Sequence, residues 1–420
     1  MMTSAIRRFF QRTFGFVSHQ SPNFKTMLIR RSLHGFSTNL SVQFNSIYAT
    51  ALGANPVQLG SLQSAGNAIG ALVSIPTGWL IDSYGLKKIF LLSTILLMVS
   101  AMLYFFAPNW IYLYAAVILL YMGVRITCIG CTVTGANELS NEQRATGRGL
   151  CRTITSVANL ITPLLGAWIV SISGGVNAKG IRPLYAMQVV TFILVLVLIA
   201  VFFHDQTQVK KFKKQGQFFS EFLRVLKQGP DIVRIMFMIA LMEIPWSMVQ
   251  PFMPLFAHQL KGADEFVLGG MVVAISIAPL LLSIPLGRLA DRHGRKILLF
   301  AISPLSWASN LLLIFAMGRN MLILSGLFFG FNSIAMGIAL AMTSEIVSKK
   351  QMGRWISIVS LVRGLMSIPV PLLGGLIWNH ISPKYVFIAA ILIDVAVRLP
   401  LLASIRETLN ISIEEDTLPD

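Results

Sequence analysis

The sequence predicts an all-α integral membrane protein built from two similar halves, and three observations support this fold class. Hydrophobic residues make up 55% of the 420 residues and charged residues 12%, about half the charged share of soluble domains. Long apolar runs alternate with short basic turns. One turn sequence, Gly-x-Leu-x-Asp-x-x-Gly-x-Lys, occurs at residues 78–87 and again at 287–296, a separation of almost half the chain.

The repeated turn has a specific physical interpretation. Gly78 and Gly287 end apolar runs and are expected to allow close helix packing, while Gly85 and Gly294 permit a positive φ in the turn itself. Short, cation-rich turns of this kind join membrane helices on the cytoplasmic side. A chance turn is the alternative, and the second copy argues against it. Among the charged residues in and directly after the two copies we single out Asp82, Lys87, Lys88, Asp291, Arg295 and Lys296.

In this turn the sequence resembles the major facilitator superfamily, whose members carry the signature between helices two and three and again between helices eight and nine. The resemblance implies twelve transmembrane helices in two pseudo-symmetric six-helix bundles, the MFS fold, with a substrate path between them. It also implies a gating role, in which Asp82 lies near Gly353 and Asp291 near Gly147 while the cytoplasmic side is closed. An acid is stabilised at a helix N-terminus, so each contact is expected to favour the outward-open state.

The distribution of basic residues predicts the orientation in the membrane. The formal net charge is +17, but the cations lie in turns between apolar runs, which argues against a nucleic-acid-binding protein. If the two repeated turns are cytoplasmic, the inside segments hold 26 of the 34 Lys and Arg residues and the outside turns hold 5. By the positive-inside rule we expect a multi-pass protein of the cell membrane, with both termini and the central linker in the cytoplasm.

The first half is expected to contain six spans. The first follows an Arg-rich, acid-free start, which we interpret as an arm on anionic lipid, with an organellar targeting segment as the alternative. Small residues at Gly60, Gly66 and Gly70 suit close packing in the second span. The sixth is the most clearly lipid-facing. The six spans are expected at 27–51, 56–81, 89–107, 112–135, 149–173 and 183–203.

The second half repeats the first after a polar linker. Apolar residues recur at helical spacing behind the basic run Lys210–Lys214, which predicts an amphipathic helix on the cytoplasmic face. Six further spans are expected at 235–260, 266–289, 297–317, 322–343, 355–378 and 385–404. The predicted domains are the arm at 1–26, the bundles at 27–203 and 234–404, the linker at 204–233 and a tail at 405–420.

Charged residues within the spans are candidates for coupling. A charge at that depth costs at least ~2.5–3.5 kcal/mol and marks a pathway or a buried pair. Glu243 lies near the middle of the seventh span and is our leading proton carrier or cation contact; a static pair with Arg125 or Arg363 is the alternative. Arg125 resembles the helix-four arginine of proton-coupled family members. Asp394 and Arg398 are four residues apart and are expected to form a mainly structural pair.

Polar residues predict the wall of a cavity. His34, Thr38, Ser41 and Asn45 recur at helical spacing on one face of the first span, and polar groups do not face lipid unsatisfied. We therefore expect this stripe to line a wet cavity, with buried hydrogen bonding between helices as the alternative. Further cavity-lining candidates are Trp246 and Gln250, which share the face of Glu243, and Asn332, at the repeat position of Arg125.

Two short motifs carry less information. The exporter motif of the resembled family is partly matched in the fifth span by Ala158, Thr162-Pro163, Gly166 and Ala167. Cys128 and Cys131 lie in an apolar run without a second pair, so we interpret them as packing residues. We expect no cofactor and no metal, and no constellation of catalytic residues points to an enzyme.

The sequence thus predicts a monomeric secondary active transporter in the lipid bilayer. It would move a small molecule by alternating access, and proton-coupled export of an amphipathic compound is favoured by the partial motif in the fifth span. A proton-coupled symporter importing a nutrient is the first alternative. A non-transporting sensor of the same fold is the second.

Overall fold

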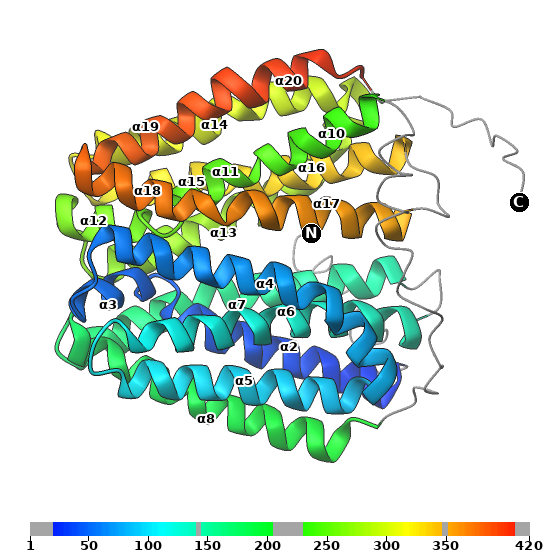
Figure 1. Ribbon diagram of the computed structural model, residues 1–420, viewed down its shortest axis with the longest axis vertical. Helices are drawn as coiled ribbons and strands as arrows, with labels where there is room; N and C mark the ends of the chain where they lie inside the picture. Colours follow the sequence, from blue (N-terminus) through cyan, green and yellow to red (C-terminus); the bar gives the residue numbers. More distant parts are fainter. Residues whose placement is uncertain (1–19, 140–143, 205–229, 347–351, 408–420) are drawn as a thin grey trace, which may run out of the picture.

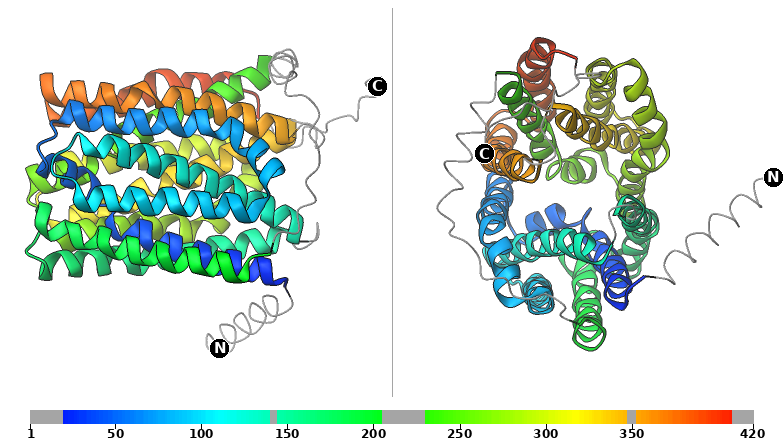
Figure 2. Two further views of the ribbon diagram at one scale, coloured as in Figure 1. Left: turned by 60° about the horizontal axis from the view of Figure 1, so that its bottom comes forward. Right: turned by 90° about the vertical axis from the view of Figure 1, so that its right-hand side faces the viewer.

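The computed structural model describes residues 20–139, 144–204, 230–346 and 352–407. Residues 1–19 of the predicted arm at 1–26, residues 205–229 of the predicted linker with its amphipathic helix, and residues 408–420 of the predicted tail lie outside the described part. Within them, helices run along one common axis in two groups that follow each other in the chain (Figure 1). Figure 2 shows the two groups side by side, seen along the helices.

The first group contains the six spans that the sequence predicts. The first span is α2 and α3, separated by a short turn at 42–44, and it begins earlier than expected because Ser21 caps Phe24 and Pro22 occupies the first helical position. The helices of this group are α2 (Pro22–Ser41), α3 (Asn45–Ala51), α4 (Pro56–Tyr84), α5 (Leu86–Phe106), α6 (Tyr112–Glu138), α7 (Arg144–Ile172) and α8 (Ala178–Phe202).

The second group also forms six spans, four of which are interrupted. The seventh span is α10 to α12, the eighth α13 and the ninth α14; the tenth is α15 and α16, the eleventh α17 and α18, and the twelfth α19, η2 and α20. The helices are α10 (Pro230–Leu241), α11 (Glu243–Val249), α12 (Met253–Lys261), α13 (Glu265–His293), α14 (Arg295–Ile314), α15 (Arg319–Phe329), α16 (Phe331–Ile346), α17 (Met352–Ser367), α18 (Pro369–His380), α19 (Pro383–Ile393), the π-helical η2 (Asp394–Arg398) and α20 (Leu399–Ser404).

Prolines explain two of the interruptions. A proline has no N–H for the carbonyl four residues earlier, so Pro245 frees the carbonyl of Leu241, where α10 ends. Pro371 likewise frees the carbonyl of Ser367, the last residue of α17. That carbonyl accepts a hydrogen bond at 2.8 Å from Asn67 Nδ2 in the first half. The break in the eleventh span therefore supplies a contact between the halves.

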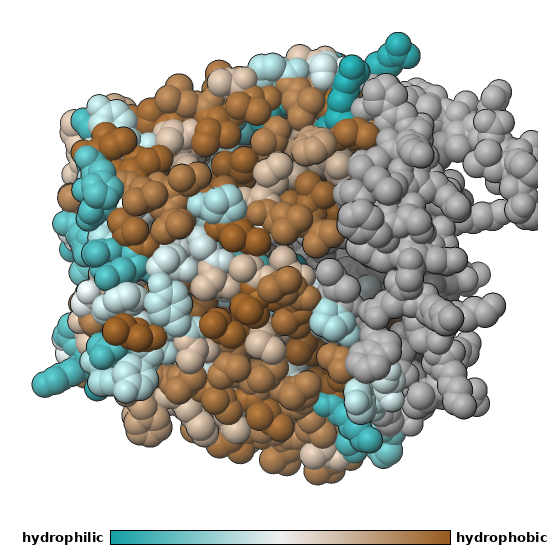
Figure 3. All heavy atoms as spheres, viewed as in Figure 1, coloured by the Kyte–Doolittle hydropathy of each residue, from teal (hydrophilic) through white to brown (hydrophobic). Residues whose placement is uncertain are grey.

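The outer surface is that of a membrane protein. Ten helical stretches in the described part of the chain are long and apolar enough to cross a bilayer; the first span, which carries Arg30 and Arg31, and α4 fall outside that set. Large apolar side chains are exposed on many helices, among them Leu72, Phe106 and Leu281. Figure 3 shows apolar residues over the sides of both groups and hydrophilic residues at one end. The described residues therefore form a multi-pass, all-α membrane protein with twelve helical spans, ten of which have the length and composition of a bilayer crossing.

Candidate functional site

The two halves pack tightly at the end opposite the repeated turns, which we call the packed end. A Cβ on Gly60 would lie 2.3 Å from the carbonyl oxygen of Pro371, and one on Gly375 would lie 2.4 Å from that of Pro56. Both glycines therefore let α4 and α18 touch backbone to backbone. Figure 1 shows α4 and α18 side by side. Toward the end with the turns, which we call the turn end, α4 and α17 separate.

A second backbone contact joins α7 to α13, close to the partial exporter motif. A Cβ on Gly269 would lie 2.9 Å from the carbonyl oxygen of Pro163. The same oxygen accepts a hydrogen bond at 3.0 Å from Gln43 Nε2 of the first span. Gly166 packs against the carbonyl of Leu40, which a Cβ would approach to 2.3 Å. The small residues of this motif thus hold the first, fifth and eighth spans together.

A cavity of about 340 Å³ lies between the halves, and we call it the central cavity. From the first half, Asn39, Gln43 and Asn159 line it, and Asn39 Nδ2 donates to Asn159 Oδ1 at 2.7 Å. From the second half, its polar lining includes Gln250, while apolar side chains such as Met271 dominate. Both halves therefore contribute to one amphipathic site.

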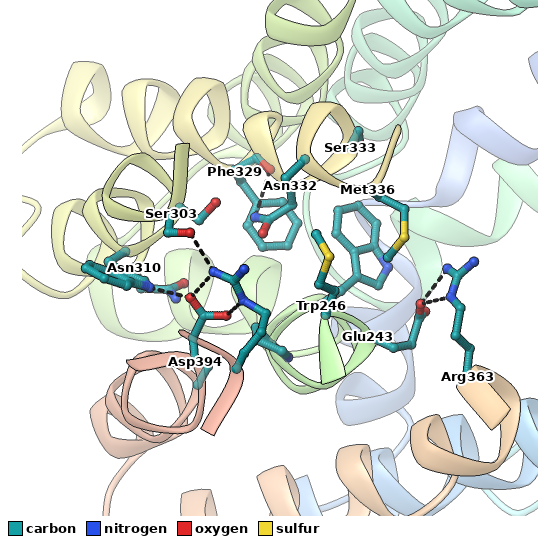
Figure 4. Close-up of a pocket in the computed structure, with 17 residues that line it drawn as sticks. Glu243, Trp246, Ser303, Asn310, Phe329, Asn332, Ser333, Met336, Arg363 and Asp394 are labelled. Atoms are coloured by element: carbon teal, nitrogen blue, oxygen red, sulfur yellow. Dashed lines mark hydrogen bonds and ion pairs between the residues drawn. The ribbon is translucent and has the colours of Figure 1, made fainter. Parts of the chain in front are cut away.

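A second cavity of about 250 Å³ lies within the second half, and we call it the polar cavity. Arg363 donates two hydrogen bonds to Glu243 Oε2, from Nη2 at 2.6 Å and from Nε at 3.0 Å. The two side chains are 27% and 19% exposed, so the pair is only partly shielded. Figure 4 shows this pair on one side of Trp246 and Asp394 on the other.

The second ion pair of the polar cavity is fully buried. Arg398 Nη2 donates to Asp394 Oδ2 at 2.8 Å, and Arg398 Nε donates to Asp394 Oδ1. Trp307 Nε1 donates to Asp394 Oδ2 at 2.7 Å, and Arg398 Nη2 also donates to Ser303 Oγ at 2.5 Å. The pair thus ties the twelfth span to the ninth, and its residues also line the cavity. The expected pairing is present, but its position in a cavity wall was not predicted.

The three candidate coupling residues do not lie together. Glu243 pairs with Arg363, although the two are 120 residues apart in the chain. The side chain of Arg125 is exposed and, within the described part of the chain, forms no hydrogen bond or ion pair; its Nε lies 3.2 Å from the Cβ that Gly70 would carry. Of the two partners considered for Glu243, the structure therefore selects Arg363.

The polar stripe of the first span differs from the expectation. Ser41 Oγ accepts from Gln188 Nε2 at 2.8 Å, and Asn45 Oδ1 accepts from Tyr185 Oη at 3.0 Å, so both face α8. The His34 ring packs against Phe192 of α8, with centroids 6.1 Å apart, and Thr38 donates to the backbone of its own helix. Hydrogen bonding between helices, the alternative interpretation, describes this face better than a cavity wall. The cavity is lined instead by the neighbouring face at Asn39, Val42 and Gln43.

The other cavity candidates lie in cavity walls. Trp246 lines both cavities and stacks on Phe329, with ring centroids 4.8 Å apart and 20° between the planes. Gln250 lines the central cavity and Asn332 the polar cavity. Neither Asn310 nor Ser303 was expected here. Both lie in the apolar ninth span, and periodicity along that span gave no signal for them.

The gating motif is described in part. Gly85 and Gly294 have φ values of 85° and 104°, as the turn requires. Asp291 is 65% exposed and contacts Arg295 of its own turn at 3.4 Å. A Cβ on Gly287 would meet nothing within 4 Å, so the expected close helix packing is absent there. The side chain of Asp82 and the surroundings of Gly147 lie outside the described part of the structure.

The turn of the second half has further contacts. Lys296 Nζ donates to the carbonyls of Ala403 and Ile405, at 2.7 and 2.6 Å. In the first half, Lys87 Nζ donates to the carbonyl of Ala200 at 2.8 Å, so the duplicated lysines fix the sixth and twelfth spans in the same way. The side chain of Lys88 is exposed. Among the described residues, no group of three His, Cys, Asp or Glu could hold a metal ion.

Comparison with known proteins identifies relatives among drug-resistance proteins. A multidrug resistance protein MdtG of Enterobacter lignolyticus (strain SCF1) is 26% identical over 281 residues, covering 64% of this chain and 65% of that protein. The tetracycline resistance protein, class B, of Escherichia coli is 25% identical over 174 residues, covering 41% and 43%. The chain therefore matches less than two thirds of the length of these curated relatives.

Solved structures agree in fold. A mutant of the nucleoside transporter NupG has a TM-score of 0.75 at 12% identity, covering 91% of this chain and 99% of that chain. A bacterial homolog of the human lysosomal transporter Spinster has a TM-score of 0.71 at 14% identity, covering 91% and 97%.

The family comparison covers most of the chain. The family model described as Major Facilitator Superfamily matches residues 28–276 and 235–406. With two packed six-helix halves and a cavity between them, the protein belongs to the major facilitator superfamily.

Proposed function

We propose that the protein is a secondary active transporter that moves a small amphipathic molecule by alternating access, with proton-coupled export as the direction. One observation carries the proposal: the central cavity is lined by both halves, with amide side chains on one wall and apolar side chains on the other. Rocking of the two halves about this cavity would expose it to one side of the membrane at a time. The cavity then binds the transported molecule.

The Glu243–Arg363 pair is the proposed coupling element. A proton on the Glu243 carboxyl would remove the charge opposite Arg363 and weaken the 2.6 Å contact between α11 and α17. Its partial exposure gives a proton access to the carboxyl. Proton binding would thereby change how the seventh and eleventh spans pack. Arg125 is proposed as a second contributor to coupling, on the strength of its place in the fourth span.

The drug-resistance relatives support export. The names of two relatives describe resistance to multiple drugs and to tetracycline, and a membrane transporter would confer resistance by removing the compound from the cell. The predominantly apolar wall of the central cavity suits compounds of this amphipathic type. We place the protein in the cell membrane with both termini in the cytoplasm, from the bias of its basic residues.

Transport by the purified full-length protein tests the proposal. Proteoliposomes with an acidic interior would be given tetracycline and a panel of amphipathic dyes from outside. We expect uptake in exchange for protons, and loss of uptake when a protonophore collapses the gradient. A matched preparation of empty liposomes corrects for passive entry. An uptake rate that is the same with and without the pH gradient would exclude proton coupling. Absence of uptake for every compound of the panel would exclude these compounds as substrates.

A further inference from the structure

Two buried polar atoms of the polar cavity have no hydrogen-bond partner: Arg398 Nη1, a donor, and Asn310 Oδ1, an acceptor. Arg398 is 4% exposed and Asn310 is 6% exposed, and both residues line the cavity. Buried polar atoms are nearly always paired, because an unsatisfied one carries the full cost of its desolvation. Both side chains belong to the cavity wall, so a bound group that reaches these two atoms would gain one donor and one acceptor that have no other partner.

The charges around the cavity are balanced. Glu243 is paired with Arg363, and Asp394 with Arg398; among the described lining residues these are the four that carry charge. A carboxylate or an ammonium group would bring an uncompensated charge into a buried space, which is strongly unfavourable. The fitting occupant is a neutral group that both accepts and donates hydrogen bonds.

The polar cavity adjoins the central cavity, and the two share three lining residues. Trp246, Phe329 and Ser333 line both, and the two rings stack on each other. On the far side of these rings the wall is apolar, with Met253, Leu268 and Ile275. At about 250 and 340 Å³, each cavity is small for a whole drug-sized molecule. Such a molecule would place its polar head in one cavity and its ring system in the other.

We propose that the polar cavity is the head-group subsite of the transporter, and that it selects substrates with a neutral carboxamide-like head attached to an aromatic body. The carbonyl of the head accepts from Arg398 Nη1, its N–H donates to Asn310 Oδ1, and the aromatic body packs on Trp246. The inference rests on the proposed function for its biological meaning, because it names the class of substrate that such a transporter would carry.

Three matched probes test the subsite without transport. Binding of 2-naphthamide, 2-naphthoate and 2-methylnaphthalene to the full-length protein in detergent would be measured by calorimetry. The probes share one ring system and differ in the head. We expect the amide to bind roughly tenfold more tightly than the hydrocarbon, the combined effect of two hydrogen bonds at the low end of their net range, and more tightly than the carboxylate. Equal affinity of amide and hydrocarbon would indicate that water fills the subsite, and tighter binding of the carboxylate would show an anion site; either result overturns the proposal.

Two variants test whether the preference for the amide probe depends on Asn310. Asn310→Leu removes the free acceptor, so the preference for the amide should fall from roughly tenfold to roughly threefold, because the bond to Arg398 Nη1 remains, while binding of the hydrocarbon persists. Ser309→Ala is the control on the same helix, because Ser309 donates to the backbone of Ser325 rather than lining either cavity; its preference should stay at the wild-type value. An unchanged preference in Asn310→Leu contradicts the assignment. If that variant fails to fold, the three-probe comparison on the wild-type protein still decides.

The test is independent of the proposed transport. A preference that depends on Asn310, in a protein that moves none of the compounds through proteoliposomes, would sustain the subsite while the proposed transport of these compounds fails. Proton-driven transport without any preference for the amide would refute the subsite alone.

Discussion

At the scale of single residues, the two ion pairs of the polar cavity have different environments and should respond differently to substitution. The Glu243–Arg363 side chains are 19% and 27% exposed, whereas those of Asp394 and Arg398 are 8% and 5% exposed. A partly exposed pair costs less to separate than a buried one. The first pair is therefore suited to opening and closing, and the second to holding α14 against the twelfth span.

Glu243→Gln should abolish the dependence of transport on the pH gradient while leaving the protein folded. The amide has the shape of the carboxyl and can still accept from Arg363, but it cannot bind a proton in the working range of pH. Uptake into proteoliposomes at several interior pH values measures this dependence. Glu265→Gln makes the same chemical change at the packed end, outside both cavities, and should retain the wild-type profile. A wild-type profile in Glu243→Gln would remove this residue from the mechanism.

Asp394→Asn should destabilise the protein by about 3–5 kcal/mol, because it leaves a buried guanidinium without its counter-charge. Thermal unfolding in detergent would show a large fall in midpoint. Replacing both partners, with Asp394→Leu and Arg398→Met, should recover much of the loss, since no buried charge then remains. A single variant as stable as the wild type would mean that the pair contributes little.

At the scale of elements, glycine contacts at the packed end set how closely α4 and α18 approach. Gly60→Ala would place a methyl group 2.3 Å from the Pro371 carbonyl oxygen, so the two helices must separate. We expect the population to shift toward conformations in which the packed end is open. Spin labels at Asn109→Cys and Ile381→Cys, in loops of the two halves at that end, would report a longer distance.

Gly337→Ala provides the matched control for that experiment. A Cβ at Gly337 meets nothing within 4 Å, and the residue lies in the interior of α16. Its distance distribution should equal that of the wild type. If Gly60→Ala also leaves the distribution unchanged, the close contact of α4 with α18 does not determine the conformational equilibrium.

At the scale of the whole molecule, the gating motif connects the two ends. In this structure the packed end is closed, and among the described residues Asp291 contacts Arg295 of its own turn. If Asp82 and Asp291 instead bind helix N-termini of the opposite half when the turn end closes, neutralising them costs that state about 0.3–1 kcal/mol each. Asp82→Asn and Asp291→Asn should therefore enrich the conformation seen here.

Spin labels at Phe202→Cys and Ser404→Cys would measure the separation of the two halves at the turn end. We expect the fraction of longer distances to rise about two- to fivefold in each aspartate variant, the change that such energies produce. Substrate affinity should change less than turnover. Identical distance distributions in the wild type and both variants would show that these two acids stabilise only their own turns and have no role in gating.

The orientation of the molecule follows from its basic turns. In a background with the three native cysteines replaced by serine, Lys179→Cys should react with a membrane-impermeant thiol reagent from outside intact cells. Gln215→Cys, in the linker, should react after the membrane is permeabilised. The opposite pattern would reverse the topology.

The sequence by itself determined the features that depend on local chemistry. Apolar runs that are long enough to cross a bilayer predict where the spans lie. The repeated turn revealed the duplication, because a turn with φ values of 85° and 104° requires glycine at the same position in each copy. The pair Asp394–Arg398 was predictable for the same reason, since residues four apart share a helix face.

Tertiary packing determined what depends on the rotation of one helix against another. Adjacent residues of a helix point about 100° apart, so a small rotation decides whether Thr38 or Asn39 faces the cavity. In this protein α8 packs against the face of the first span that carries Ser41 and Asn45. Gln188 donates a hydrogen bond to Ser41, and Tyr185 donates one to Asn45. The pairing of Glu243 with Arg363 and the presence of Asn310 and Arg398 in one cavity wall bring together residues about 90 to 120 positions apart in the chain. No local pattern encodes such pairs, because neighbouring helices set their geometry.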